Sequence, residues 1–264
     1  MLRGLLIALS FLTIIPVRLR AETTEMQMLG AAVFFPIVGI MLGAAAAASG
    51  EIFGFLFSPE ISAALMLLVL LVMTGGLHMD GLSDTFDALA SKAGRERRLD
   101  IMKEGPAGPV GVTAMVFTLG LKYLALLSLT NMTYFVYYAA IVFMPMVGRW
   151  AMLAGMLVGR PARADGLGRI YIGRLGWGRF AGATLVLAAL MAGPGLLGNS
   201  YAPVDWAVMA AVVLVFIYMY VLLFNRVAVK RFGGLTGDVL GAMGETAEAL
   251  FLLMVIAWSR LYTL

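Results

Sequence analysis

Seven segments of almost uncharged, apolar residues make up most of this 264-residue chain. A helix needs about 20 such residues to cross the hydrocarbon core of a bilayer, where every backbone polar group must find a partner within the protein. The pattern therefore predicts an all-α, polytopic membrane helix bundle of about seven transmembrane helices in one integral domain, 1–264. The predicted spans are 28–50, 61–78, 109–130, 134–158, 181–199, 206–224 and 239–258.

The shorter apolar stretch from Gly4 to Val17 predicts a re-entrant or interfacial helix ahead of the first span. The composition agrees with a membrane protein, because 62% of the residues are hydrophobic and only 13% are charged. A soluble domain carries about 25% charged residues. The chain has no cysteine, which excludes disulfide bonds and thiolate metal sites.

Basic residues are concentrated in alternate connections between the predicted spans. They lie before residue 28 and in 79–108, 159–180 and 225–238, whereas the connections 51–60, 131–133 and 200–205 contain none. The positive-inside rule then places the N-terminus and the basic connections on the cytoplasmic side of a bacterial inner membrane. We interpret the net charge of +4 as a signal of orientation among membrane lipids, and we expect no nucleic-acid partner.

Three aspartates follow the second predicted span. Asp80, Asp84 and Asp87 are spaced i, i+4 and i+7, so they project from one side of a helix. Carboxylates beside a span usually indicate a functional site, and a hard cation such as Mg²⁺ suits them. The alternative is a solvated helix start, where aspartate favours the helix dipole. His78 falls on the opposite side of that helix, which is typical of a core residue that forms hydrogen bonds.

A second acidic set lies in the last span. Asp238 and Glu245 are seven residues apart, Glu248 follows three residues later, and glycines between them leave room for close approach of a ligand or another helix. A polar seam that forms hydrogen bonds between helices is the alternative. If both sets converge, the carboxylates must protonate or bind cations. Because Mg²⁺ is often held by one or two carboxylates plus substrate phosphates, this favours a phosphorylated substrate.

Several basic residues lie near these acidic sets. Lys103 precedes a glycine-rich turn, where the backbone N–H of Gly108 and its neighbours can hold a phosphate. Arg149 lies inside a span and pairs either with a carboxylate or with a substrate phosphate. Lys122 is expected to snorkel or to form a structural ion pair. We assign the other arginines, including those of the glycine-rich connection 159–179, to membrane topology.

These motifs resemble those of the cobalamin synthase, or adenosylcobinamide-GDP ribazoletransferase, family. The matches run in the family's order over nearly the whole chain. The chain departs from the family pattern at Lys103-Glu104-Gly-Pro-Ala, where the family usually has Lys-Asp followed by a basic residue. The matching segments are Phe11-Leu-Thr-Ile-Ile-Pro-Val, His78-x-Asp-Gly-Leu-x-Asp-x-x-Asp, Arg98-Leu-Asp-Ile-Met-Lys with Gly108-x-x-Gly, Gly148-Arg149 and Gly234-Leu-Thr-Gly-Asp-x-Leu-Gly-Ala.

The resemblance implies a transferase of cobalamin biosynthesis. Adenosylcobinamide-GDP would give its cobinamide phosphoryl group to a ribose hydroxyl of α-ribazole or α-ribazole 5′-phosphate, releasing GMP and forming adenosylcobalamin or its 5′-phosphate. In our hypothesis the catalytic residues are Asp84, Asp238 and Glu245, and the residues that contact phosphate are Lys103, Arg149 and Gly108. The predicted Mg²⁺ ligands are Asp80, Asp84, Asp87, Asp238, Glu245 and Glu248.

Two alternatives use similar acidic helices. A cation-coupled secondary transporter also carries carboxylates in its spans, but here both acidic sets lie near the cytoplasmic boundary and no paired halves are evident. Other intramembrane Mg²⁺-dependent transferases hold diphosphates in the same way. Prenyltransferases usually mix asparagine with aspartate, and neither acidic set contains asparagine. CDP-alcohol phosphotransferases continue Asp-Gly with Ala-Arg, where this chain has Ser83-Asp84.

Overall fold

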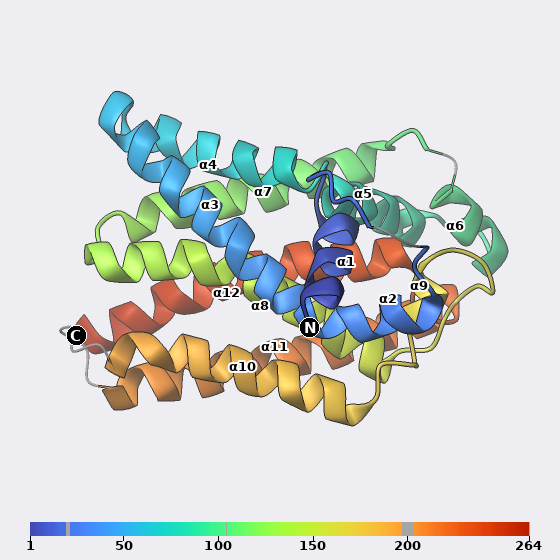
Figure 1. Cartoon of the computed structure of the whole chain (residues 1–264). Coiled ribbons are helices and arrows are strands. Elements are labelled where there is room, and N and C mark those ends of the chain that lie inside the picture. The colour runs from blue at the N-terminus through green and yellow to red at the C-terminus, as the bar shows by residue number, and fades with distance from the viewer. Residues whose placement is uncertain (20–21, 104, 197–202, 264) are drawn as a thin grey trace.

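The computed structural model describes residues 1–19, 22–103, 105–196 and 203–263. The described part is a helical bundle (Figure 1), with one isolated parallel β-bridge between Pro161 and Leu235. The helices in chain order are α1 Leu2–Leu12, α2 Glu25–Ala31, the 3-10 helix η1 Ala32–Phe34, α3 Phe35–Leu56, α4 Pro59–Met73, α5 Leu77–Ala90, α6 Arg95–Ile101, α7 Pro109–Leu129, α8 Tyr134–Val158, α9 Gly168–Tyr171, α10 Trp177–Leu196, α11 Pro203–Phe232 and α12 Gly237–Thr263.

The structure confirms a polytopic membrane bundle. Each of the seven predicted spans lies in a helical region, although 197–199 of the fifth lies outside the described residues. Within the described residues, α10 is a shorter apolar helix, and α1 is the short apolar helix expected near the N-terminus. The segments that are long and apolar enough to cross a membrane are Glu25–Leu56, Pro109–Leu129, Tyr134–Val158, Trp206–Phe232 and Gly237–Leu261.

The second predicted span, 61–78, is broken rather than continuous. Helices α4 and α5 meet at a 90° bend, so they add a sixth crossing only if the bent pair is counted as one span. Gly75 and Gly76 between them have φ values of 61° and 71°, a left-handed conformation that glycine adopts without strain. The bend carries α5 away from the direction of α4, and α5 lies outside the five spans.

Helix α8 is the buried centre of the bundle. Nearly all its residues from Ala140 to Met156 are buried, including Trp150. Helix α3 approaches it closely, because a Cβ added to Gly39 would clash with the backbone at Met146. A Cβ added to Gly43 would clash with the backbone at Val142. Small residues at this spacing let two membrane helices pack backbone to backbone.

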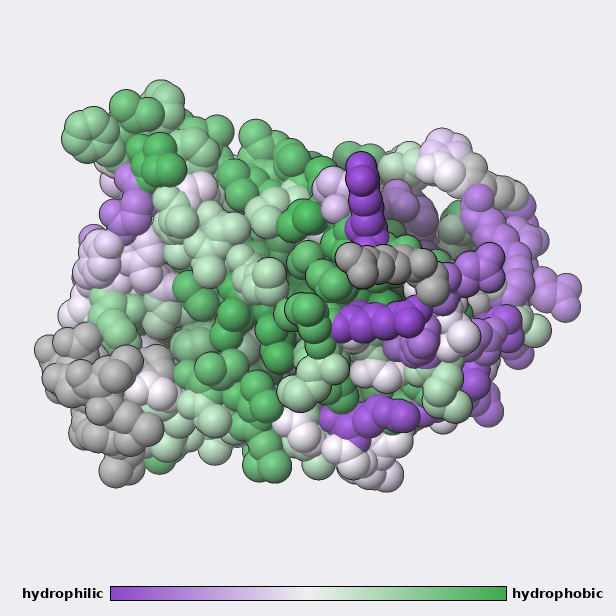
Figure 2. Space-filling view, in the orientation of Figure 1, coloured by the Kyte–Doolittle hydropathy of each residue, from purple (hydrophilic) through white to green (hydrophobic). Residues whose placement is uncertain are grey.

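The surface is divided between an apolar body and one hydrophilic end. Figure 2 shows hydrophobic residues over most of the visible face, with hydrophilic residues gathered at one end. Helices α5, α6 and α9 lie at that end, together with the first turns of α12 (Figure 1). We call it the polar end. It is the part of the bundle where both predicted acidic sets begin.

Candidate active site

Helices α5 and α12, which carry the two acidic sets, pack closely through glycines. A Cβ added to Gly81 would lie 2.8 Å from the Cα of Asp238, and one added to Gly241 would lie 3.1 Å from the Cα of His78. Because no side chain separates the two backbones at these points, the first turns of α12 lie directly against α5. Of the second set, Asp238 comes within electrostatic range of Asp84, whereas Glu245 and Glu248 pair with Lys122.

Asp80, Asp84 and Asp238 form an acidic trio at the polar end. Asp84 lies within electrostatic range of both other members of the trio, and also of Asp87 and Arg163. Arg163 donates a hydrogen bond of 3.0 Å from Nη2 to Oδ2 of Asp238. The Thr236 hydroxyl donates to the same oxygen at 3.1 Å. An arginine therefore supplies a counter-charge to a group of carboxylates that would otherwise repel each other.

Asp87 has a different environment from the acidic trio. Its Oδ2 accepts a hydrogen bond of 2.7 Å from the Gly108 N–H, and its Oδ1 accepts one of 2.8 Å from the Gly111 N–H. The carboxylate thereby caps the N-terminus of α7, whose first N–H groups have no partner within the helix. The Gly108 N–H, which was predicted to bind phosphate, donates to Asp87 instead. Gly108 is therefore not part of the proposed phosphate site.

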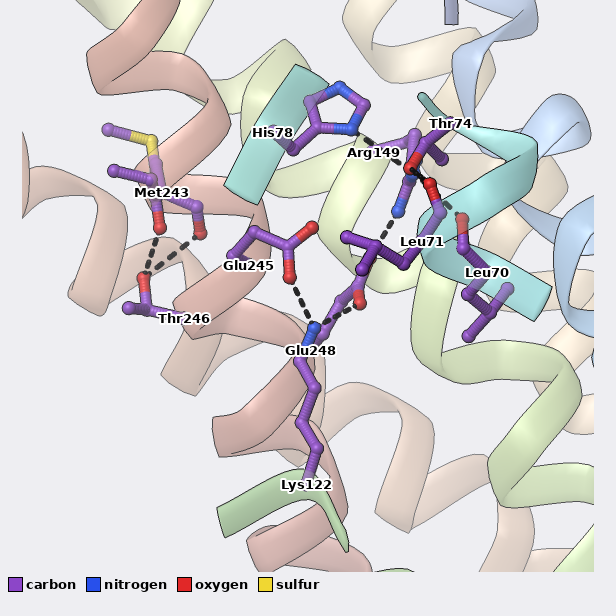
Figure 3. A network of polar contacts seen from close by, with 11 residues as sticks. Leu70, Leu71, Thr74, His78, Lys122, Arg149, Met243, Glu245, Thr246 and Glu248 are labelled. Atoms are coloured by element: carbon purple, nitrogen blue, oxygen red, sulfur yellow. Dashed lines mark hydrogen bonds and ion pairs between the residues drawn. The ribbon is translucent and has the colours of Figure 1, made fainter. Parts of the chain in front are cut away.

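Glu245 and Glu248 lie in a buried network of ion pairs (Figure 3). Lys122 Nζ donates to Oε2 of Glu245 at 2.6 Å and to Oε2 of Glu248 at 2.6 Å, and Arg149 donates to Oε1 of Glu248. Two cations and two anions, all at most 7% exposed, thus neutralise one another. Lys122 forms the expected structural pair, and Arg149 pairs with a carboxylate, one of its two predicted alternatives.

The six predicted Mg²⁺ ligands are therefore divided among three environments. In the part of the chain that the structure describes, no three histidine or acidic side chains stand in a metal-holding arrangement. Asp87, Glu245 and Glu248 each accept hydrogen bonds from donors within the protein. The metal roles of these three residues, and the catalytic role of Glu245, remain predictions. The acidic trio is the remaining candidate for a cation site.

A cavity of about 460 Å³ lies beside the acidic trio. It is enclosed by α1, α5, α8, the start of α12 and the connection 159–171, and Asp238 forms part of its wall. Lys103, a predicted phosphate ligand, also lines it. Other lining residues include Phe11, His78, Met152, Met156, Arg163, Asp165, Arg169, Tyr171 and Leu240.

The connection 159–171 supplies residues that we did not predict as part of the site. It is held to the strand-like segment before α12, because the Ala162 N–H donates to Leu235 O and the Leu235 N–H donates to Arg160 O, both at 2.8 Å. This pairing brings Arg163 and Asp165 to the cavity wall. The sequence pattern alone assigns these arginines to membrane topology. Membrane topology requires basic residues but not an acidic one, so Asp165 is the one residue of this connection whose type could have indicated a site.

Asp165 links this connection to the segment that follows α6. Its Oδ2 accepts a hydrogen bond of 2.7 Å from Lys103 Nζ. The Lys103 ammonium lowers the pKa of the Asp165 carboxyl below its usual value, chiefly through this hydrogen bond. Both side chains are substantially exposed, so this ion pair can open at little cost when another anion enters the cavity.

Comparison with known proteins identifies the family. The sequence profile of the cobalamin-5-phosphate synthase family matches residues 4–256. The chain belongs to this family. Curated relatives named adenosylcobinamide-GDP ribazoletransferase include that of Roseiflexus sp. (strain RS-1), 37% identical over 93% of this chain and 86% of its own. The relative of Geotalea daltonii is 34% identical over 97% of this chain and 98% of its own. No solved structure matches.

The region shared with the cobalamin-5-phosphate synthase family contains the complete candidate site. Residues 4–256 include α5, the connection 159–171 and the acidic part of α12. A third relative, the adenosylcobinamide-GDP ribazoletransferase of Desulfitobacterium hafniense, is 35% identical over 96% of each chain. The family assignment therefore applies to the residues that form the cavity and the acidic trio.

Proposed function

We propose that this protein transfers the cobinamide phosphoryl group of adenosylcobinamide-GDP to a ribose hydroxyl of α-ribazole or its 5′-phosphate, with release of GMP. The reaction takes place at the polar end, which faces the cytoplasm of a bacterial cell. The observation that carries the proposal is the acidic trio, whose member Asp238 forms part of the wall of a cavity that is also lined by Lys103, Arg163 and Arg169. Carboxylates beside cations suit a reaction between phosphates and a divalent ion.

The trio has the chemistry expected of a magnesium site. Its ligand atoms would all be carboxylate oxygens, which hard divalent cations prefer. The Arg163 guanidinium already places a positive charge against the Asp238 carboxylate. We propose that Asp80, Asp84 and Asp238 hold Mg²⁺. When bound there, the ion would supply positive charge that stabilises the negative charge developing on the leaving GMP.

The side chains of this protein supply proton transfer and phosphate binding. In the transfer, the phosphorus–oxygen bond to GMP breaks and a bond to the ribose oxygen forms. A carboxylate of the trio accepts the proton of the attacking hydroxyl. Asp84 suits this role, because its partial burial, and then its repulsion by Asp80, Asp238 and Asp87, favour the protonated carboxyl. Lys103 and Arg163 hold phosphate oxygens at the cavity wall.

The test is GMP release by protein purified into lipid nanodiscs. With adenosylcobinamide-GDP, α-ribazole 5′-phosphate and Mg²⁺, the wild-type protein should release GMP, and EDTA should stop the release. Asp84→Asn keeps the size of the side chain and removes its charge. We expect it to lower the rate about 10²–10⁴-fold, the usual contribution of a general base.

Glu96→Gln is the matched control. Glu96 is an exposed carboxylate of α6 at the same end of the molecule, and it does not line the cavity beside the trio. The control should keep the wild-type rate. GMP release that is equal in Asp84→Asn and the wild type would remove Asp84 from the mechanism. Absence of GMP release with any divalent cation would overturn the proposed function.

A further inference from the structure

The cavity has a buried apolar part and a charged rim. The buried lining includes Met152, Met156, Leu240 and Tyr171, each at most 4% exposed. Lys103, Arg163, Asp165, Arg169 and Asp238 are exposed or half-buried and form the rim. The ligand that fits this lining has an apolar ring system at one end and an anionic group at the other.

The tautomer of His78 follows from its contact with Arg149. The Arg149 Nη2 lies 3.3 Å from Nδ1 of His78, on the side of the ring drawn toward Arg149 in Figure 3. A guanidinium group can only donate hydrogen bonds, so Nδ1 must be the acceptor. In a neutral imidazole the proton then lies on Nε2. His78 therefore presents an N–H donor.

This donor has no partner within the described protein. His78 is 3% exposed and lines the cavity, and its Nε2 makes no hydrogen bond. The Tyr171 hydroxyl, on the same cavity wall, is also buried without a partner. Buried polar groups are nearly always satisfied, so two such groups at one cavity indicate a ligand that supplies their partners.

We propose that this cavity binds the acceptor nucleoside and that His78 Nε2–H donates to the free ring nitrogen of its base. The inference rests on the proposed function. The base of α-ribazole is dimethylbenzimidazole, an apolar bicyclic ring with one unprotonated nitrogen. Guanine carries several donors and acceptors, and most of them would be unpaired beside His78 and Tyr171. The buried lining therefore suits the acceptor base rather than the guanine of the donor.

The charged rim of the cavity can bind the phosphate and the ribose of the acceptor. Lys103 and Arg169 suit the 5′-phosphate of α-ribazole 5′-phosphate, and each now pairs with an exposed carboxylate that the phosphate can replace. Asp238 is part of the same wall. A nucleoside held with its base against His78 therefore has its ribose near Asp238, the member of the acidic trio that lines the cavity.

The chain contains a single histidine, which permits a direct test. Protein labelled with ¹⁵N-histidine in lipid nanodiscs should show one imidazole, protonated on Nε2. Adding α-ribazole 5′-phosphate without any divalent cation should shift the Nε2 resonance, and adding GMP should not. A shift with GMP alone, or no shift with a saturating acceptor, would overturn the proposal. GMP release by the complete mixture tests the proposed function separately.

A second test compares acceptors that differ in one atom. An analogue in which carbon replaces the free ring nitrogen should bind the wild-type protein about tenfold more weakly than α-ribazole 5′-phosphate, because one hydrogen bond is lost. In His78→Asn this difference should disappear, whereas Thr85→Val should keep it. Thr85 is a buried residue of α5 outside the cavity. Equal affinity of wild-type protein for both acceptors would contradict the role of His78, even if the variant fails to fold.

Discussion

The charged side chains buried inside the bundle are stable there because they neutralise one another. Lys122 neutralises Glu245 and Glu248 in a buried position, so Lys122→Met leaves an uncompensated negative charge among apolar helices. Breaking a buried pair in this way costs about 3–5 kcal/mol. We expect a loss of that size in the free energy of unfolding, measured by reversible denaturation in mixed micelles.

The double variant Lys122→Met/Glu245→Gln is the control for this prediction. It restores a balance between Arg149 and Glu248, so it should recover much of the lost stability. If the single variant were as stable as the wild type, the network would not contribute to stability as described. The position of Lys122 inside a span predicted that it would snorkel or form a structural ion pair. Its partners depend on how α7 is rotated against α12, which is a property of the folded molecule.

Helices α5 and α12 position the acidic trio through their contact at Gly81. Gly81→Ala adds a methyl group 2.8 Å from the Cα of Asp238, which forces the two backbones apart. Misplacement of reacting groups by about 1 Å can cost about 10²-fold in rate. We therefore expect GMP release to fall at least tenfold, while the protein still inserts and purifies as a folded bundle.

Gly120→Ala is the matched glycine control. No atom lies within 4 Å of a Cβ added at Gly120 in α7, and alanine favours a helix more than glycine does. This variant should keep full activity. Full activity in Gly81→Ala would show that the close helix contact does not position the site.

The elements were largely predictable, and their geometry was not. Hydrophobic runs predicted helical regions correctly, but in the described residues five of them, or six with the bent pair, are long and apolar enough to cross a membrane. The 90° bend after Met73 was missed, because the apolar run continues through it and only the φ values of Gly75 and Gly76 reveal it. The role of the connection 159–171 was also missed, since arginines that line a cavity resemble arginines that set topology.

The orientation of the complete molecule can be tested with single cysteines. The natural chain contains none, so Glu96→Cys at the polar end and Asn131→Cys in the connection between α7 and α8 give unambiguous labels. Because positive connections remain in the cytoplasm, a membrane-impermeant maleimide should label Asn131→Cys in intact spheroplasts. Glu96→Cys should react only after the membrane is opened. Labelling of Glu96→Cys in intact spheroplasts would reverse the proposed orientation.

Binding of Mn²⁺ to the purified protein, followed by electron paramagnetic resonance, tests most directly whether α5 and α12 together form one cation site. We predict that Asp84→Asn on α5 and Asp238→Asn on α12 each weaken Mn²⁺ binding, whereas Glu96→Gln leaves it unchanged. The same Mn²⁺ affinity in all these variants and the wild type would contradict the account.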